Sequence, residues 1–185
     1  MRWFWVDRFH EFIHGQRAVA VKNVSLAEDY LVHGMRGLAV FPASLIVEGM
    51  AQTGGLLVGE TNQFTERVVL AKIAKAQFYG LAVPGDRLVY TAVLEDMQRD
   101  GAIVRGTVYI GERLLADLEL VFAHLNERVA QEELFEPAEF LRLLRILGLY
   151  EVGRHADGSP LQIPEKYLKA ERASAGLSGE LAERD

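Results

Sequence analysis

The chain has 185 residues, of which 50% are hydrophobic and 25% charged, and its formal net charge is −6. This balance is typical of a folded globular protein and gives no support to nucleic-acid binding, which usually needs a basic surface. The absence of cysteine excludes disulfides, thiolate zinc sites and a cysteine nucleophile, and fits a cytoplasmic protein. No secretory signal is expected, because the N-terminal apolar run is short and ends at Asp7.

The first predicted elements are two short strands within residues 9–23, joined by a turn at Gly15-Gln16. Ser25 and Glu28 have the spacing of a capping box, which predicts a short helix over residues 26–31. Residues 32–41 hold two glycines and no helical spacing. We therefore expect a loop there.

Residues 42–59 form the most informative segment, a predicted helix that is apolar on nearly all its faces. Ser44, Glu48 and Gln52 are four residues apart, so they share one face. A helix this apolar is normally buried, and it is expected to bury Glu48, which is costly unless the carboxylate is paired or its pKa shifts. Such surroundings are typical of a catalytic acid. A structural carboxylate satisfied by Gln52 is the alternative.

A membrane span does not fit this helix, although about 20 apolar residues suffice for one. The polar residues named above and four glycines argue against it. The glycines indicate instead a helix that lies close to another backbone. Proline at position 42 suits the first turn of a helix, where its missing N–H costs nothing.

Four strand-like runs follow a polar break, separated by turn signals at residues 84–86, 99–101 and 111–112. The runs are residues 68–81, 87–94, 103–110 and 113–124. One long apolar helix followed by antiparallel hairpins predicts an α+β fold in which the sheet wraps around the central helix.

The character of the sequence changes beyond residue 125. Apolar residues recur at helical spacing over residues 135–150, which predicts an amphipathic helix. Residues 151–185 are polar and are expected to be loosely ordered, with a short helix around residues 166–173. We therefore expect a domain over residues 1–125, followed by a C-terminal helical extension and polar tail over residues 126–185.

Three blocks of this sequence resemble the 3-hydroxyacyl-acyl-carrier-protein dehydratases of fatty acid synthesis, which have the hot-dog fold. Residues 4–8, Phe-Trp-Val-Asp-Arg, are similar to the family's Phe-Leu-x-Val-Asp-Arg. Residues 42–52, Pro-Ala-Ser-Leu-Ile-Val-Glu-Gly-Met-Ala-Gln, are similar to its Pro-Gly-x-Leu-x-x-Glu-Ala-x-Ala-Gln, the most specific block. Residues 83–88 are similar to its Val-x-Pro-Gly-Asp-x-Leu turn. The resemblance covers residues 1 to about 125.

The resemblance implies a lyase that dehydrates 3-hydroxyacyl chains, with a histidine as base and the helix glutamate as acid. These roles fall on His33 and Glu48. Backbone amides around Ala43 and Ser44 would polarise the thioester carbonyl, and Gln52 would orient Glu48. The implied partner is acyl carrier protein, and the acyl chain is carried on its phosphopantetheine or on CoA. No other cofactor and no metal is expected. The family implies a homodimer or higher homo-oligomer, with each site drawn from two subunits.

One feature departs from the family pattern. The family's histidine lies fourteen positions before the glutamate, where this chain has Gly34, and His33 is one residue earlier. A one-residue insertion in the loop would keep His33 at the site. Two other interpretations stay open: a hot-dog acyl thioesterase in which Glu48 activates water, and a non-catalytic acyl-binding or scaffold homologue that has lost its histidine.

Overall fold

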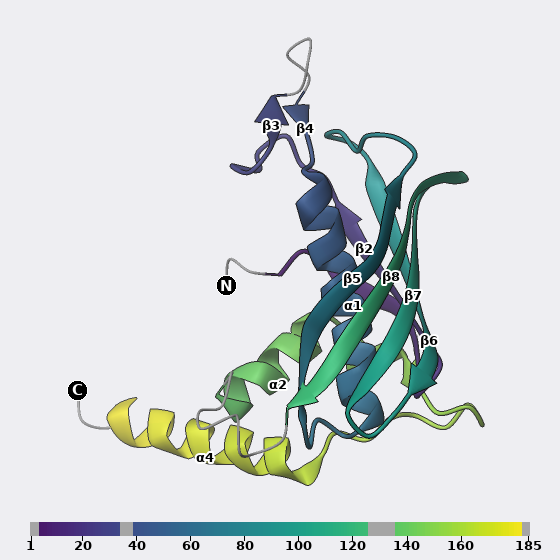
Figure 1. The fold of residues 1–185 in the computed structure, drawn as a ribbon. Helices are drawn as coiled ribbons and strands as arrows, with labels where there is room; N and C mark the ends of the chain where they lie inside the picture. The colour runs from purple at the N-terminus through teal and green to yellow at the C-terminus, as the bar shows by residue number, and fades with distance from the viewer. Residues whose placement is uncertain (1–3, 34–38, 126–135, 183–185) are drawn as a thin grey trace.

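A curved antiparallel sheet wraps around one long helix in the computed structural model, which describes residues 4–33, 39–125 and 136–182 (Figure 1). The helix is α1, Ala43–Thr61. Within the described residues the sheet has seven strands in the order β5-β8-β7-β6-β2-β1-β9. Their bounds are β1 Arg8–Ile13, β2 Arg17–Asn23, β5 Arg67–Phe78, β6 Arg87–Met97, β7 Gly101–Ile110, β8 Arg113–Leu125 and β9 Gly153–Arg154. This architecture confirms the predicted α+β hot-dog fold.

The core lies between α1 and the concave face of the sheet. Alternate residues of β6 point inward, so that Leu88, Tyr90 and Ala92 are fully buried while their neighbours are more exposed. This period of two is what a strand with one buried face requires. On α1, Met50 and Leu57 are fully buried against this face.

The close contact between helix and sheet depends on a glycine in α1. A Cβ atom built on Gly49 would lie 2.9 Å from the Tyr90 ring and hydroxyl and 3.1 Å from the carbonyl oxygen of Trp5. Real Cβ atoms do not approach other atoms so closely, so this position accepts only glycine without movement of its neighbours.

The predicted short helix over residues 26–31 is wrong, because the chain forms two consecutive turns there. The Ser25 hydroxyl accepts a hydrogen bond from the Ala27 amide at 3.2 Å, which is a local turn. The Glu28 carboxylate binds Lys22 at 2.9 Å and is not part of a helix cap.

The predicted loop over residues 32–41 is only partly right. It contains a two-stranded hairpin, β3 Val32–His33 and β4 Ala39–Val40, which lies beyond the N-terminal end of α1 (Figure 1). Residues 34–38 are outside the described part of the chain.

The C-terminal residues form three helices, α2 Pro137–Ile146, α3 Leu149–Val152 and α4 Glu165–Ala182. The single helix predicted over residues 135–150 is therefore broken, and the break falls at Gly148, whose φ of 69° is left-handed. Residue 135 lies outside the described residues. The short helix predicted around residues 166–173 is confirmed and lies within α4, but α4 is 18 residues long, so the expectation of a loosely ordered tail is wrong over the rest of this helix.

This C-terminal part is joined to the sheet. Strand β9 pairs in parallel with β1, where Phe12 lies opposite Gly153. The Phe9 amide donates to the Leu147 carbonyl at 2.7 Å, and the His14 amide donates to the Arg154 carbonyl at 2.9 Å. Every helix in the described part of the chain is too short or too polar to span a lipid bilayer.

Candidate active site

The predicted polar stripe lies on α1, where Glu48 is exposed and Gln52 is half-buried. The expected burial of Glu48 is therefore wrong for the single chain. The sheet covers only the opposite side of the helix, which carries Ile46 and Met50. The apolar side chains near Glu48 are only partly covered, and Leu45 and Val47 are examples.

Gln52 links Glu48 to the N-terminal segment. Its Oε1 atom accepts a hydrogen bond from the Trp5 backbone amide at 2.8 Å, and its Nε2 atom donates to Glu48 Oε1 at 3.0 Å. Because a backbone N–H can only donate, the first bond fixes the orientation of the amide and turns its NH₂ group towards Glu48. The predicted pairing of Gln52 with Glu48 is present in the structure.

The N-terminus of α1 presents backbone donors that have no acceptor within the helix. Pro42 is the N-cap and has no capping side chain. The intrahelical bonds begin with the amides of Leu45 and Ile46, which both donate to the Pro42 carbonyl at 3.0 and 3.2 Å. The amides of Ala43 and Ser44 precede these bonds, and both residues are exposed. A helix start of this kind attracts negative charge.

The turn over residues 83–88 supports this helix start. The Phe41 amide, next to Pro42, donates to the Ala82 carbonyl at 2.9 Å. Within the turn, the Asp86 carboxylate accepts from the Val83 amide at 2.9 Å. The residue that precedes the second block is thus hydrogen-bonded to the residue that precedes the third.

The structure places His33 by its backbone only. Its partner in the β3–β4 hairpin is Ala39, four residues before Ala43. The hairpin brings His33 to the end of α1 that carries the amides of Ala43 and Ser44 (Figure 1). The His33 side chain and Gly34 lie outside the described residues, so the catalytic role of His33 stays a prediction.

A cluster of charges that was not predicted from the sequence lies beside this site. Lys22 is only 8% exposed, and its Nζ atom lies 2.9 Å from Glu28 Oε1 and 3.2 Å from Asp7 Oδ1. Burial acts to lower the pKa of Lys22, but the hydrogen bonds and charges of Glu28 and Asp7 outweigh it and leave the pKa raised. Two features of the sequence indicate this cluster. Asp7 belongs to the first family block, and Lys22 lies in a predicted strand with apolar neighbours.

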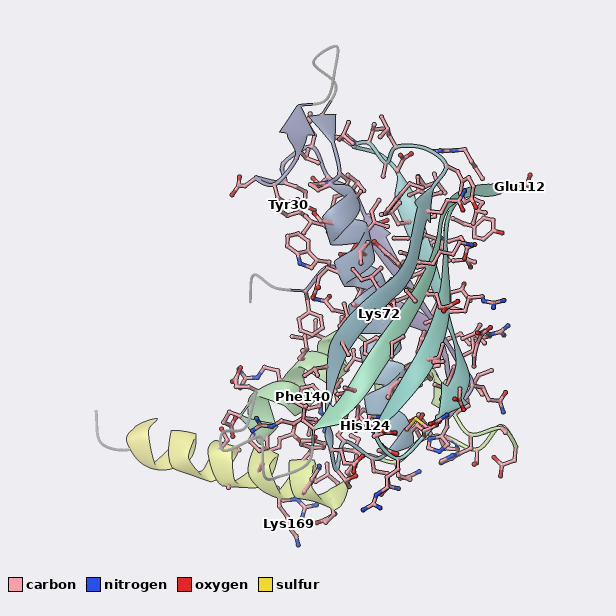
Figure 2. The ribbon with its side chains drawn as sticks, in the orientation of Figure 1. Tyr30, Lys72, Glu112, His124, Phe140 and Lys169 are labelled. Atoms are coloured by element: carbon pink, nitrogen blue, oxygen red, sulfur yellow. The ribbon has the colours of Figure 1, made fainter. Side chains whose placement is uncertain are left out.

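Tyr30 completes this cluster and lies beside α1 (Figure 2). Burial, together with its hydrogen bond to Glu28, raises the pKa of Tyr30 to about 12. Its ring packs edge-on against Trp5 at a centroid distance of 4.4 Å and against Phe41 at 5.7 Å.

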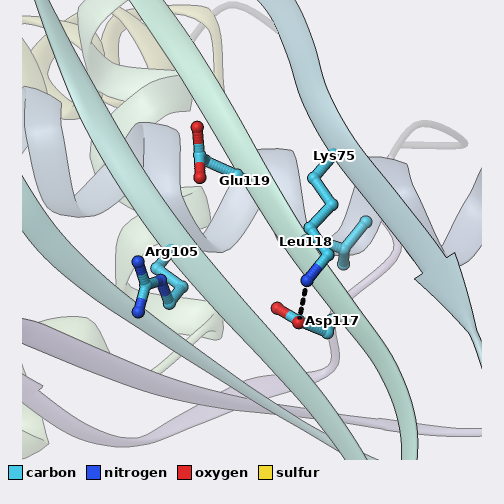
Figure 3. A pocket seen from close by; sticks show the side chains of 5 residues that line it. All are labelled: Lys75, Arg105, Asp117, Leu118 and Glu119. Carbon is cyan, nitrogen blue, oxygen red and sulfur yellow. Dashed lines mark hydrogen bonds and ion pairs between the residues drawn. The ribbon is translucent and has the colours of Figure 1, made fainter.

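A shallow pocket on the outer face of the sheet is a different kind of surface (Figure 3). The Lys75 Nζ atom there lies 2.5 Å from Asp117, and Arg105 lies 3.1 Å from Glu95. These are cross-strand ion pairs on a solvated face. The pocket has no connection to Glu48 and is not part of the candidate site.

Comparison with known proteins first identifies the class of domain that this chain contains. Residues 4–122 match the family described as the FabA-like domain. A solved structure, the dehydratase heterocomplex ApeI:P from Xenorhabdus doucetiae, shares the fold with a TM-score of 0.56 at 14% identity, covering 76% of this chain and 88% of that one.

Curated relatives identify the family to which the chain belongs. The chain is 37% identical over 119 residues to the 3-hydroxyacyl-[acyl-carrier-protein] dehydratase FabZ of Pelotomaculum thermopropionicum, covering 64% of this chain and 85% of the relative. It is 38% identical to the protein of the same name from Symbiobacterium thermophilum, covering 64% and 84%. The chain belongs to the 3-hydroxyacyl-acyl-carrier-protein dehydratase family, and the resemblance of the three sequence blocks is confirmed.

Proposed function

We propose that this chain dehydrates 3-hydroxyacyl thioesters carried on acyl carrier protein to trans-2-enoyl thioesters, in the cytoplasm, during fatty acid or related acyl-chain synthesis. The observation that carries this proposal is the Trp5–Gln52–Glu48 chain of hydrogen bonds, which fixes the carboxyl group on the face of a helix whose first two amides have no acceptor within the helix. Family membership supplies the reaction class.

The chemistry needs a base, an acid and a site for the thioester oxygen. His33 takes the C2 proton of the substrate, and the C2–C3 double bond forms. The C3 hydroxyl accepts a proton from Glu48 and leaves as water. The amides of Ala43 and Ser44 bind the thioester oxygen, whose negative charge grows as the C2 proton departs. Glu48 lies five residues beyond Ala43, or about 8 Å along the helix axis, close enough to reach C3 of a substrate held at the helix start.

The active unit is a dimer in this proposal. Strand β5 ends the sheet, and all its residues from Leu70 to Gln77 are exposed. Leu70 and Ile73 expose 36% and 47% of their surface. A long edge strand with apolar side chains is suited to pair with a second copy of the chain. The second copy would also cover Glu48 and supply the hairpin that carries His33.

The test measures turnover of a 3-hydroxyacyl substrate on both acyl carrier protein and CoA. Glu48→Gln and His33→Ala are each expected to lose at least about 100-fold in kcat, the usual scale of acid–base catalysis. His10→Ala is the control, because His10 is an exposed histidine that contacts Arg87 at 3.0 Å. Full activity of His33→Ala would remove His33 from the mechanism, and full activity of Glu48→Gln would refute the proposed site.

A further inference from the structure

Lys22 is a buried cation held between two segments that both border the candidate site. Lys22 lies on β2 and is 8% exposed. One of its carboxylate partners, Asp7, belongs to the N-terminal segment, and the other, Glu28, belongs to the turns that precede β3. Removing a lysine side chain from water is costly, so a lysine in this position needs both partners.

The Asp7 side leads to the candidate acid. Asp7 Oδ2 accepts hydrogen bonds from the Asn23 amide at 2.7 Å and from the Asn23 side chain at 3.0 Å. The Asp7 amide donates to the Val21 carbonyl at 2.7 Å. These bonds anchor the N-terminal segment to β2, and two residues earlier the Trp5 amide holds Gln52, which in turn holds Glu48.

The Glu28 side leads to the candidate base. Tyr30 forms a hydrogen bond with Glu28 and packs its ring on Trp5 and Phe41. His33 follows Tyr30 by three residues. The position of the Glu28–Tyr30 segment therefore sets where the β3–β4 hairpin leaves the body of the protein.

We propose that Lys22 is a positioning residue that serves two active sites of the dimer. Within its own chain it holds Glu48 of one site through Asp7, and it holds the hairpin that carries His33 to the other site through Glu28. This inference rests on the proposed dehydratase function. Lys22 touches neither substrate nor reacting atoms. Without its cation, two carboxylates face each other and the N-terminal segment and the residue 25–31 turns separate.

The experiment compares Lys22→Met, which keeps an unbranched side chain one atom shorter and removes the charge, with Lys169→Met. Lys169 is an exposed lysine on α4, at the opposite end of the molecule from Tyr30 (Figure 2). Lys22→Met is expected to lower kcat by about 10- to 100-fold, the scale of a small misplacement of catalytic groups, with KM changed by less than about 3-fold. Lys169→Met is expected to match the wild type. Melting curves establish that each variant is folded at the assay temperature.

A second readout does not depend on turnover. The chain has two tryptophans, Trp3 and Trp5, so a Trp3→Phe background isolates the fluorescence of Trp5. Acrylamide quenching of Trp5 is expected to rise in Lys22→Met and to stay at the parent value in Lys169→Met. Adding Glu28→Gln to Lys22→Met removes one of the two facing charges, and it is expected to restore part of both kcat and the protection of Trp5.

The two proposals fail in different ways. If the wild type does not dehydrate the substrate, the proposed function is refuted, and the catalytic positioning role of Lys22 falls with it even where quenching changes. If the wild type is active and Lys22→Met equals Lys169→Met in kcat and quenching, the role of Lys22 is refuted while the function stands. A loss of kcat without any change in Trp5 quenching also contradicts positioning through the N-terminal segment.

Discussion

Gly49 follows the candidate acid and stands where the family pattern has alanine. We expect Gly49→Ala to destabilise the protein by about 1–3 kcal/mol, because the new Cβ would overlap the Tyr90 ring. Gly55→Ala on the same helix is the control. A Cβ there lies 3.4 Å from Phe122, an ordinary contact, so this change is neutral or stabilising by up to about 1 kcal/mol through helix propensity. Urea unfolding measures both variants.

The Tyr90 hydroxyl offers a check on the cause. It is buried and has no hydrogen-bond partner among the residues that the structure describes, and burial raises the pKa of Tyr90. Tyr90→Phe removes the oxygen that the new methyl group would meet, so the double variant is expected to recover part of the lost stability. Equal unfolding free energies for Gly49→Ala and Gly55→Ala would contradict this account of the packing.

Individual residues of the site were predictable from sequence where they share a helical period. Glu48 and Gln52 are four apart, and the structure joins them by a hydrogen bond. Burial of Glu48 was not predictable, because apolar composition does not say whether the sheet or another chain covers a given face. Lys22 was missed because its partners, Asp7 and Glu28, are 15 and 6 residues away in sequence and meet only through the fold.

At the scale of elements, strong periodic patterns and turn signals were reliable. Strand β8, Arg113–Leu125, differs from its prediction by one residue, and α1 ends two residues later than predicted. The errors fall on short segments and on the tail, where α4 is longer than the short helix that was predicted. The capping-box spacing at Ser25 did not produce a helix because Glu28 gains more from a buried lysine than from an exposed amide. The single helix predicted over residues 135–150 runs through Gly148, whereas the chain ends α2 at Ile146 and uses Gly148 as the N-cap of α3.

The C-terminal helices share the core of the sheet domain. Leu144 of α2 is fully buried and belongs to the same hydrophobic cluster as Phe9 and Phe12 of β1. We expect Leu144→Ala to lower the free energy of unfolding by about 2–5 kcal/mol. The whole chain should still unfold in a single transition, at a lower temperature than the wild type. Ile146→Ala is the control, since Ile146 is 64% exposed on the same helix. Calorimetry that shows a separate transition for residues 136–182, with the sheet domain unaffected, would contradict a shared core.

At the scale of the whole molecule, the two edges of the sheet differ. The β1 edge is partly covered by β9 from the C-terminal part of the chain, whereas β5 leaves 12 residues at the other edge. The C-terminal extension therefore blocks pairing at the β1 edge and leaves the β5 edge available for pairing with a second copy. In the proposed dimer, pairing through β5 would place His33 of one subunit opposite Glu48 of the other.

Mixed dimers test this sharing. Refolding equal amounts of His33→Ala and Glu48→Gln chains together gives about half mixed dimers, each with one intact pair of catalytic residues. Activity is expected to return to about a quarter of the wild-type value. Each variant refolded alone is the control. If both residues of a site came from one chain, the mixture would stay as inactive as its components.

The central claim is that this chain removes water from a 3-hydroxyacyl thioester. The most direct measurement is the intact mass of a 3-hydroxyacyl chain on acyl carrier protein, before and after incubation with the wild-type protein. Loss of one water with the thioester intact is the result we predict. Release of the free carrier thiol would indicate a thioesterase, and an unchanged mass in the presence of bound acyl chain would indicate an acyl-binding protein without catalysis; either contradicts the account.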